Sequence, residues 1–190
     1  MVTCIALQSV THVAWKNGGG LTRELLSWPV ADAWQVRCSV ATIDRQGRFS
    51  RFAGVERWFT VISPIGLSLT MNGQVFKLDG DSAPLQFDGA HDCVVTEIEG
   101  NVTAFNVMAT NGWQASVARS KGGDQANLQP LDFLGLFCLQ KGVCQIGDRI
   151  VHACVNQFYW RQVFDACRVD VLSGQWLLVR GFQVSAVVSN

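Results

Sequence analysis

The dominant feature of this chain is a succession of short apolar segments, each separated from the next by Gly, Asn or Asp residues. Within the segments, β-branched and aromatic residues either alternate with polar ones or follow one another directly. Such segments are typical of strands, and many short strands between turn residues are typical of sandwiches and barrels. No segment before Asn111 has the spacing of an amphipathic helix. The sequence therefore predicts an all-β protein.

The expected strands form two series on either side of a polar, glycine-bearing segment at residues 120–130. This segment is the best candidate for a connector, which predicts two domains, residues 1–119 and 120–190. We expect the second domain to be a smaller barrel that is completed by strands from the N-terminal half. The expected strands are residues 2–7, 21–28, 34–43, 56–62, 66–71, 74–78, 83–87, 93–98, 102–108, 113–118, 136–139, 143–146, 149–153, 157–160, 168–172, 176–180 and 183–188.

Two hairpin signals support this organisation. Asn72-Gly73 between two expected strands predicts a two-residue hairpin turn. Residues 73–81 and 142–148 share a pattern in which a glycine opens a short strand that ends at Gly-Asp. Such hairpins recur in small cupin barrels, so their presence in both halves indicates a duplicated barrel. In the second half, turns are expected at Ser173-Gly174 and Gly181.

Composition excludes several classes of protein. A chain of 190 residues with 48% hydrophobic and 16% charged residues is globular and can bury a substantial core. Lys plus Arg equals Asp plus Glu at 15 each, without a long run of either sign, which argues against nucleic-acid and anionic-membrane partners. No apolar run is long enough to span a bilayer, and the N-terminus lacks a secretion signal. We therefore expect a cytoplasmic protein.

Cysteine and histidine patterns do not predict a metal site. The seven cysteines have irregular spacing and lie mostly in apolar segments, which favours buried free thiols over disulfides. Cys38 and Cys93 are candidates for reactive thiols, but inert buried ones are the favoured interpretation. His12, His91 and His152 are far apart and have no neighbouring ligand types. We expect three surface or turn histidines, and neither a metal nor a cofactor.

A glycine-rich stretch at residues 15–29 begins with Trp-Lys-Asn-Gly-Gly-Gly and continues with Leu-Thr-Arg-Glu. Consecutive glycines allow unusual backbone angles and close approach to another group. One interpretation is a flexible hairpin with nothing bound. The other is a shaped turn beside a pocket, with Trp15 and Asn17 nearest to a ligand.

Polar residues inside apolar strands are the second candidate signal. In the strand at residues 34–43, the period of two places Arg37, Ser39 and Ala41 on one face. An arginine beside small residues suits a carboxylate ligand, since guanidinium presents a fixed fork of donors. The alternative is an arginine paired with a structural acid such as Glu24 or Glu97.

Two further segments belong with this strand. Asn106 is the main polar residue of the strand at residues 102–108, and a buried amide must be hydrogen-bonded to backbone, water or ligand. The segment at residues 47–59 places Phe49, Ser50 and Arg57 around a glycine-bearing turn. This segment is either a surface loop or a pocket rim that supplies a second cation.

Several of these segments together resemble one family. Residues 15–25 are similar to the W-x-N-G-G-G-x-T-R-E-L signature of the HutD family, also called Ves, and residues 47–57 are similar to its G-x-F-S-x-F-x-G-x-x-R pattern. These proteins are bacterial and are associated with histidine utilisation. Further matches follow in family order at residues 37–43, 67–69, 87–89 and 105–108, so the resemblance covers residues 15–108.

The resemblance implies two cupin-like, RmlC-like jelly-roll barrels packed in one compact chain (a bicupin) without the usual cupin metal motif. The chain departs from the family pattern at Val36, where members often carry Trp, and at Ala104, where many carry Asp. Position 104 shares a face with Asn106, so the chain lacks a carboxylate that many members have. The C-terminal half carries no family motif that can be matched residue by residue.

On this resemblance and the residues above, we expect a non-enzymatic small-molecule-binding or regulatory accessory protein. Its ligand would be a small carboxylate of histidine breakdown, such as formylglutamate. One alternative is a metal-independent cupin enzyme acting on a small acid, with Glu24 or Glu97 as general base, and another is a protein-interaction module. A homodimer is left open. The expected ligand-binding residues are Trp15, Asn17, Arg37, Ser39, Phe49, Ser50, Arg57 and Asn106.

Overall fold

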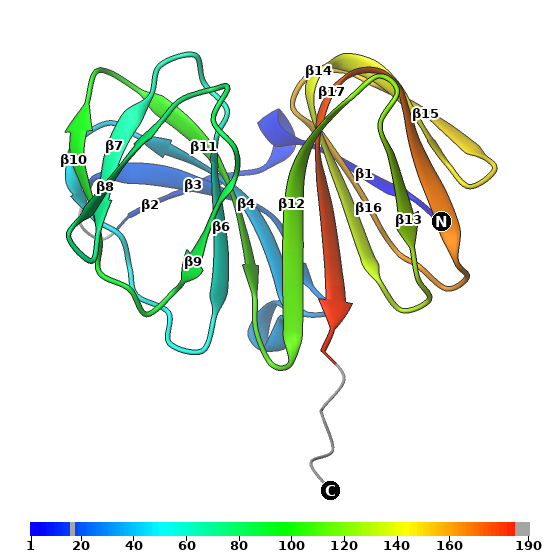
Figure 1. Ribbon diagram of the computed structural model, residues 1–190, viewed down its shortest axis with the longest axis horizontal. Helices are drawn as coiled ribbons and strands as arrows, with labels where there is room; N and C mark the ends of the chain where they lie inside the picture. The colour runs from blue at the N-terminus through cyan, green and yellow to red at the C-terminus, as the bar shows by residue number, and fades with distance from the viewer. Residues whose placement is uncertain (16–17, 185–190) are drawn as a thin grey trace, which may run out of the picture. The chain divides into compact units, whose positions relative to one another are not determined.

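The computed structural model describes residues 1–15 and 18–184 (Figure 1). The described residues form strands and two short 3-10 helices, η1 (Leu7–Ser9) and η2 (Ala31–Ala33), which confirms the all-β prediction. The strands are β1 (Thr3–Ala6), β2 (His12–Ala14), β3 (Gly20–Trp28), β4 (Val36–Ile43), β5 (Gly47–Arg48), β6 (Glu56–Val61), β7 (Leu67–Met71), β8 (Gln74–Leu78), β9 (Leu85–Asp88), β10 (Cys93–Ile98), β11 (Val102–Ala109), β12 (Trp113–Lys121), β13 (Gln125–Leu128), β14 (Phe133–Ile146), β15 (Arg149–Ala153), β16 (Gln157–Gln162) and β17 (Cys167–Gln183).

The chain divides into two compact units. The N-terminal unit is Val10–Asn111, and the C-terminal unit combines Met1–Ser9 with the chain from Gly112 onward. These bounds differ from the expected division after residue 119, because β12 pairs along its whole length with β17. Similarly, the first strand of the chain pairs with β16 of the C-terminal unit.

The N-terminal unit contains two antiparallel sheets. A six-stranded sheet has the order β2-β3-β4-β11-β6-β9, and a four-stranded sheet has the order β5-β10-β7-β8 (Figure 1). Apolar side chains from β4 and β6 of the first sheet pack with those from β7 and β10 of the second in one buried cluster. The predicted hairpin is confirmed, since Asn72 and Gly73 join β7 to β8 with φ angles of 51° and 80°.

The C-terminal unit is built on one seven-stranded sheet with the central order β1-β16-β14-β17-β12. Two predictions were wrong here. The polar segment at residues 120–130 contains strand β13, which pairs with β17, so it is not a plain connector. The long strands β14 and β17 each replace two expected short ones, residues 136–139 and 143–146 in β14 and residues 168–172 and 176–180 in β17. The expected strand at residues 183–188 lies mostly outside the described residues.

Glycines inside β14 and β17 explain why short strands were predicted where the structure has two long ones. The register between these strands shifts near Gln140 and Val143. A Cβ added to Gly142 would lie 2.2 Å from the Ser173 carbonyl oxygen, and one added to Gly174 would lie 2.5 Å from the Gln140 carbonyl oxygen. Glycine is therefore needed for the close approach of two bent strands, although in sequence it resembles a turn signal.

All seven cysteines are free thiols. Cys38, Cys93, Cys138 and Cys144 are buried, and burial raises the pKa of each, to about 11 for Cys138 and about 12 for Cys144. The interpretation of Cys38 and Cys93 as inert thiols is supported, since the reactive form is the thiolate.

These pKa shifts predict the order of thiol labelling. In the native protein at pH 8, a thiol reagent should first label the exposed Cys4 and Cys154, and the four buried thiols should react only on unfolding. Mass spectrometry of the labelled peptides measures this order. Fast labelling of Cys38 in the native protein would contradict the buried geometry.

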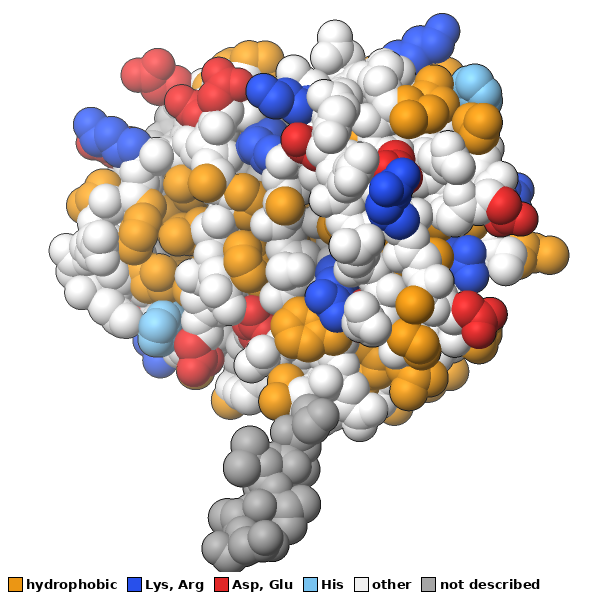
Figure 2. Space-filling view, turned by 45° about the vertical axis from the view of Figure 1, so that its right-hand side comes forward, with side chains coloured by type: hydrophobic (Ala, Val, Ile, Leu, Met, Phe, Trp, Pro, Cys, Tyr) orange, Lys and Arg blue, Asp and Glu red, His pale blue; other side chains and the backbone are white. Residues whose placement is uncertain are grey.

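The equal numbers of acidic and basic residues lead us to expect a surface of mixed charge. Figure 2 shows acidic and basic side chains interspersed on the visible face, without a large area of one sign. Among the described residues, no helix has the length and apolar character needed to cross a membrane.

Candidate ligand-binding site

A cavity of about 690 Å³ lies within the N-terminal unit. Of the expected ligand-binding residues, Trp15, Arg37, Ser39, Phe49, Ser50, Arg57 and Asn106 line it, and Asn17 lies outside the described residues. The cavity is further lined by Val13, Ala14, Thr22, Glu24, Ala41, Arg48, Phe52, Phe59 and Met108.

Strand register explains why residues far apart in sequence meet in this cavity. Glu24, Ser39, Asn106 and Phe59 stand opposite one another across β3, β4, β11 and β6. Two residues further along β11, Met108 stands opposite Arg37 of β4 on one side and opposite Arg57 of β6 on the other. Since side chains alternate between the faces of a sheet, both sets point to the cavity side.

The deepest cation of the cavity is Arg57. Arg57 is 6% exposed. Its guanidinium carbon lies 5.4, 5.6 and 5.1 Å from the ring centroids of Phe49, Phe52 and Phe87. Nη1 donates to the Ser50 carbonyl at 3.1 Å. Nε is buried without a hydrogen-bond partner, and among the described residues no carboxylate forms an ion pair with Arg57.

Burial lowers the pKa of Arg57 to about 10, and the neighbouring charge of Arg37 acts in the same direction. The side chain remains cationic at neutral pH, because a pKa near 10 is still well above 7. A buried cation with an unused donor is an unfavourable arrangement unless an anion or another acceptor can reach it.

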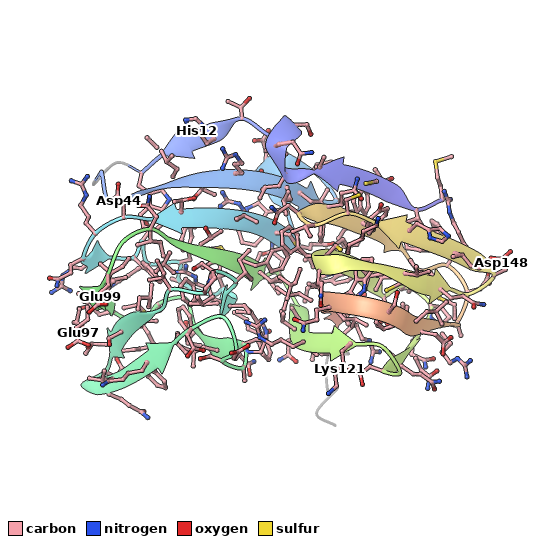
Figure 3. The ribbon with its side chains drawn as sticks, turned by 90° about the horizontal axis from the view of Figure 1, so that it is seen from above. His12, Asp44, Glu97, Glu99, Lys121 and Asp148 are labelled. Atoms are coloured by element: carbon pink, nitrogen blue, oxygen red, sulfur yellow. The ribbon has the colours of Figure 1, made fainter. Side chains whose placement is uncertain are left out.

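Arg37 is neutralised, unlike Arg57. Its Nη2 lies 2.6 Å from Glu24 Oε2, and the Ser27 hydroxyl donates to Glu24 Oε1 at 2.7 Å. A β-bulge between Glu24 and Leu26 shifts the register so that Ser27 stands opposite Arg37. The structure thus pairs Arg37 with Glu24. The other candidate acid, Glu97, accepts a hydrogen bond from Ser68 and points outward at the edge of the unit (Figure 3).

Asn106 and Ser39 supply neutral polar groups between the charged ones. Both are buried, and the Asn106 amide donates only a long bond of 3.5 Å to the Ala104 carbonyl. The expected backbone partner is therefore present but weak. The amide and the Ser39 hydroxyl remain available to a polar group of a bound molecule.

An aromatic wall completes the cavity. Trp15 meets Phe49 edge to face at 6.0 Å, and Phe49 packs against Phe59 at 5.4 Å. The Trp15 indole donates to the Thr22 hydroxyl at 2.6 Å, and the Trp15 backbone pairs with Gly20. These contacts hold Trp15 and Gly20 beside the cavity, while residues 16 and 17 of the glycine-rich stretch lie outside the described residues.

The segment at residues 49–52, which forms the rim of the cavity, is held at its first and last residues by backbone hydrogen bonds. The Phe49 amide donates to the Cys93 carbonyl at 2.9 Å, and the Phe52 amide donates to the Gly89 carbonyl at 2.7 Å. A Cβ at Gly89 would lie 2.6 Å from the Phe52 carbonyl oxygen, so this glycine permits the contact. The segment is thus fixed beside Arg57 and supplies the carbonyl of Ser50.

Sequence reasoning omitted several lining residues that strand alternation could have found. Met108 shares a face with Asn106, Phe59 with Arg57, and Thr22 with Glu24. Glu24 was expected only as a structural partner or as a general base. Alternation places Glu24 on the same face as Thr22, whereas the bulge after Glu24, for which the sequence offers no clear signal, places Ser27 opposite Arg37.

The residues facing the cavity do not fit a metal ion. Cupin metals are held by imidazoles joined by a carboxylate, whereas the described lining contains one carboxylate, from Glu24, and no histidine. That carboxylate is already paired with Arg37. Within residues 1–15 and 18–184, no three His, Cys, Asp or Glu side chains gather as metal ligands.

The chain is similar to proteins from several bacteria. Protein Ves of Citrobacter koseri is 45% identical in an alignment of 150 residues that covers 73% of this chain and 73% of that one. An uncharacterized 21.2 kDa protein in the hutC 3′ region of Pseudomonas putida is 41% identical over 103 residues, or 53% of this chain. The match spans about half of that relative, 54% of its length.

Solved structures show the same fold. HutD from Pseudomonas fluorescens SBW25, determined in a formate condition, superposes with a TM-score of 0.83 at 22% identity, covering 97% of this chain and 100% of that one. A cupin 2 conserved barrel domain protein from Leptotrichia buccalis superposes with a TM-score of 0.60 at 8% identity over 95% and 96% of the two chains. The fold is therefore cupin-like. A family model described as HutD matches residues 7–157, and the chain belongs to the HutD family.

Proposed function

We propose that the N-terminal unit binds a small carboxylate and that the protein acts as a non-enzymatic accessory factor of histidine breakdown. The cavity volume of about 690 Å³ lies in the range of small-molecule sites. Its walls are mainly apolar, with a few polar groups that converge from neighbouring strands. This combination suits an acid with an apolar body.

The observation that carries the proposal is the environment of Arg57. This guanidinium is buried, has an unused Nε donor, and forms no ion pair with a described carboxylate. A ligand carboxylate would supply the missing charge and the missing acceptor together. Each charge-assisted hydrogen bond would contribute about 1.5–3 kcal/mol.

Neighbouring groups would orient the acid. Arg37 also has a buried Nε without a partner, and it lies on the same face with only Met108 between it and Arg57. Strands lie about 4.8 Å apart, so side chains two strands apart can reach one molecule. Asn106 and Ser39 would bond a polar group, and Trp15 and Phe49 would enclose the apolar body.

We also infer that each unit is a cupin-like barrel, so that the chain is a bicupin. The similarity to a cupin barrel protein over 95% of this chain supports this arrangement. In the N-terminal unit, the packing of a six-stranded sheet against a four-stranded one would form the barrel around the cavity.

Calorimetric titration of the protein with a panel of acids tests the proposal. The panel contains formate, acetate, urocanate, glutarate and formylglutamate, and the matched neutral amides serve as controls. At least one acid should bind saturably, and at a hundredfold excess over Kd it should stabilise the fold by about 2.7 kcal/mol. Binding of the amides as tightly as the acids, or no binding by any acid, would contradict the proposal. Turnover of an acid that is lost in Glu24→Gln would instead favour an enzyme.

A further inference from the structure

The ionisable side chains that line the cavity carry more positive than negative charge. Arg37, Arg57 and Glu24 line its interior, and Arg48 lines it where it is paired with Asp92. The Arg48 and Asp92 side chains are 67% and 36% exposed, and Asp92 also pairs with Arg51 at 3.4 Å, so water screens the charges of this group from the interior. The interior groups therefore carry two positive charges and one negative charge, a surplus of one positive charge.

The negative charge is fixed in place. Glu24 is held by Arg37 at 2.6 Å and by the Ser27 hydroxyl at 2.7 Å, and the bulge in β3 places Ser27 opposite Arg37. Register places Glu24 opposite Ser39, which itself lies opposite Asn106. A ligand that is anchored on Arg57 and bonded to Asn106 thus extends toward the Glu24 carboxylate.

A single carboxylate on Arg57 would bring the interior groups to neutrality. A second carboxylate would have to approach Glu24 or separate it from Arg37. Like charges a few ångströms apart in a partly buried site repel strongly, because the effective dielectric constant there is far below that of water. Two negative charges on the ligand are therefore one too many for this cavity.

Resting on the proposed function, we propose that Glu24 determines ligand charge: the cavity selects acids with one carboxylate over acids of equal size with two. Neutral amides are tolerated at the second position, since Asn106 and Ser39 can hydrogen-bond them. The ligand class is thus a monocarboxylate with an apolar body and a neutral polar end. Formylglutamate, with two carboxylates, should bind less tightly than its monoamide formylglutamine.

The test uses pairs of ligands that differ only in charge. Glutarate and its monoamide glutaramate have nearly the same shape, as do formylglutamate and formylglutamine. In the wild-type protein, the monoamide of each pair should bind about tenfold more tightly than the diacid. In Glu24→Gln, which keeps the side-chain shape, the interior groups carry two positive charges, so the preference for the monoamide should disappear or reverse, with a ratio of one or below.

A matched control separates local from long-range charge effects. Glu97→Gln makes the same change of charge in the same unit, but Glu97 does not line the cavity. This variant should keep the wild-type ratio. Diacids that bind as tightly as their monoamides in the wild-type protein, or a ratio that Glu24→Gln leaves unchanged, would overturn the role of Glu24 and leave carboxylate binding intact. Absence of binding by every acid would instead contradict the proposed function.

Discussion

Replacing Arg57 by Met should abolish carboxylate binding and leave the fold as stable as before, or more stable. The loss of two charge-assisted hydrogen bonds would weaken binding roughly hundredfold or more. Stability should not fall, because Arg57 is a buried cation without an ionic partner among the described residues. The lowered pKa of Arg57 leads to the same expectation. A base whose pKa falls on folding destabilises the folded state while it is charged, so its removal should not lower stability.

Met is a suitable replacement because its flexible thioether can occupy the space among Phe49, Phe52 and Phe87 and contact their rings favourably. Calorimetric titration and urea unfolding measure the two effects separately. Arg45→Met is the matched control, since Arg45 is exposed and does not line the cavity. A variant Arg57→Met that unfolds much more easily would show that Arg57 is a structural residue.

The second large effect is expected at Gly20, where alanine should destabilise the protein by about 3 kcal/mol. A Cβ at this position would lie 2.4 Å from the Thr42 carbonyl oxygen and 3.3 Å from the Trp15 ring. The carbonyl belongs to β4, which pairs with β3, so it cannot move away without breaking the sheet. Displacement of Trp15 should also weaken ligand binding.

Gly18→Ala provides the comparison for this prediction. Gly18 has a φ of 69°, and a Cβ there would have no atom within 4 Å. Its replacement should therefore cost only the strain of a left-handed backbone, about 1 kcal/mol. Urea unfolding of both variants measures the difference. If the two variants lost the same free energy of unfolding, the close contact of Gly20 with β4 and Trp15 would not contribute to stability.

The sequence predicted those parts of the site that depend on local periodicity. The period of two placed Arg37, Ser39 and Ala41 on one face, and these three side chains line the cavity. It also distinguished Asn106 as a polar residue in an apolar strand. These predictions hold because the alternation of side chains in a strand does not depend on the rest of the fold.

Features that depend on contacts between distant strands could not be predicted in this way. The pairing of Glu24 with Arg37 depends on the register of β3 with β4, and the position of Ser27 beside them depends on a bulge. The burial of Arg57 depends on rings from two separate segments, since Phe49 and Phe52 lie between β5 and β6 and Phe87 lies in β9. Gly142 was interpreted as the start of a short strand and Gly174 as a turn residue, because sequence alone does not reveal that two strands meet there.

The most direct measurement of carboxylate binding observes the arginine side chains themselves. In protein labelled with ¹⁵N, the Nε–H signals of Arg57 and Arg37 can be assigned by their loss in the Arg57→Met and Arg37→Met variants. Both Nε atoms are buried without a partner, so a bound carboxylate should shift their signals saturably, while the signal of exposed Arg45 stays in place. If an acid that binds by calorimetry leaves the Arg57 signal unmoved, the ligand site lies elsewhere and the central claim is wrong.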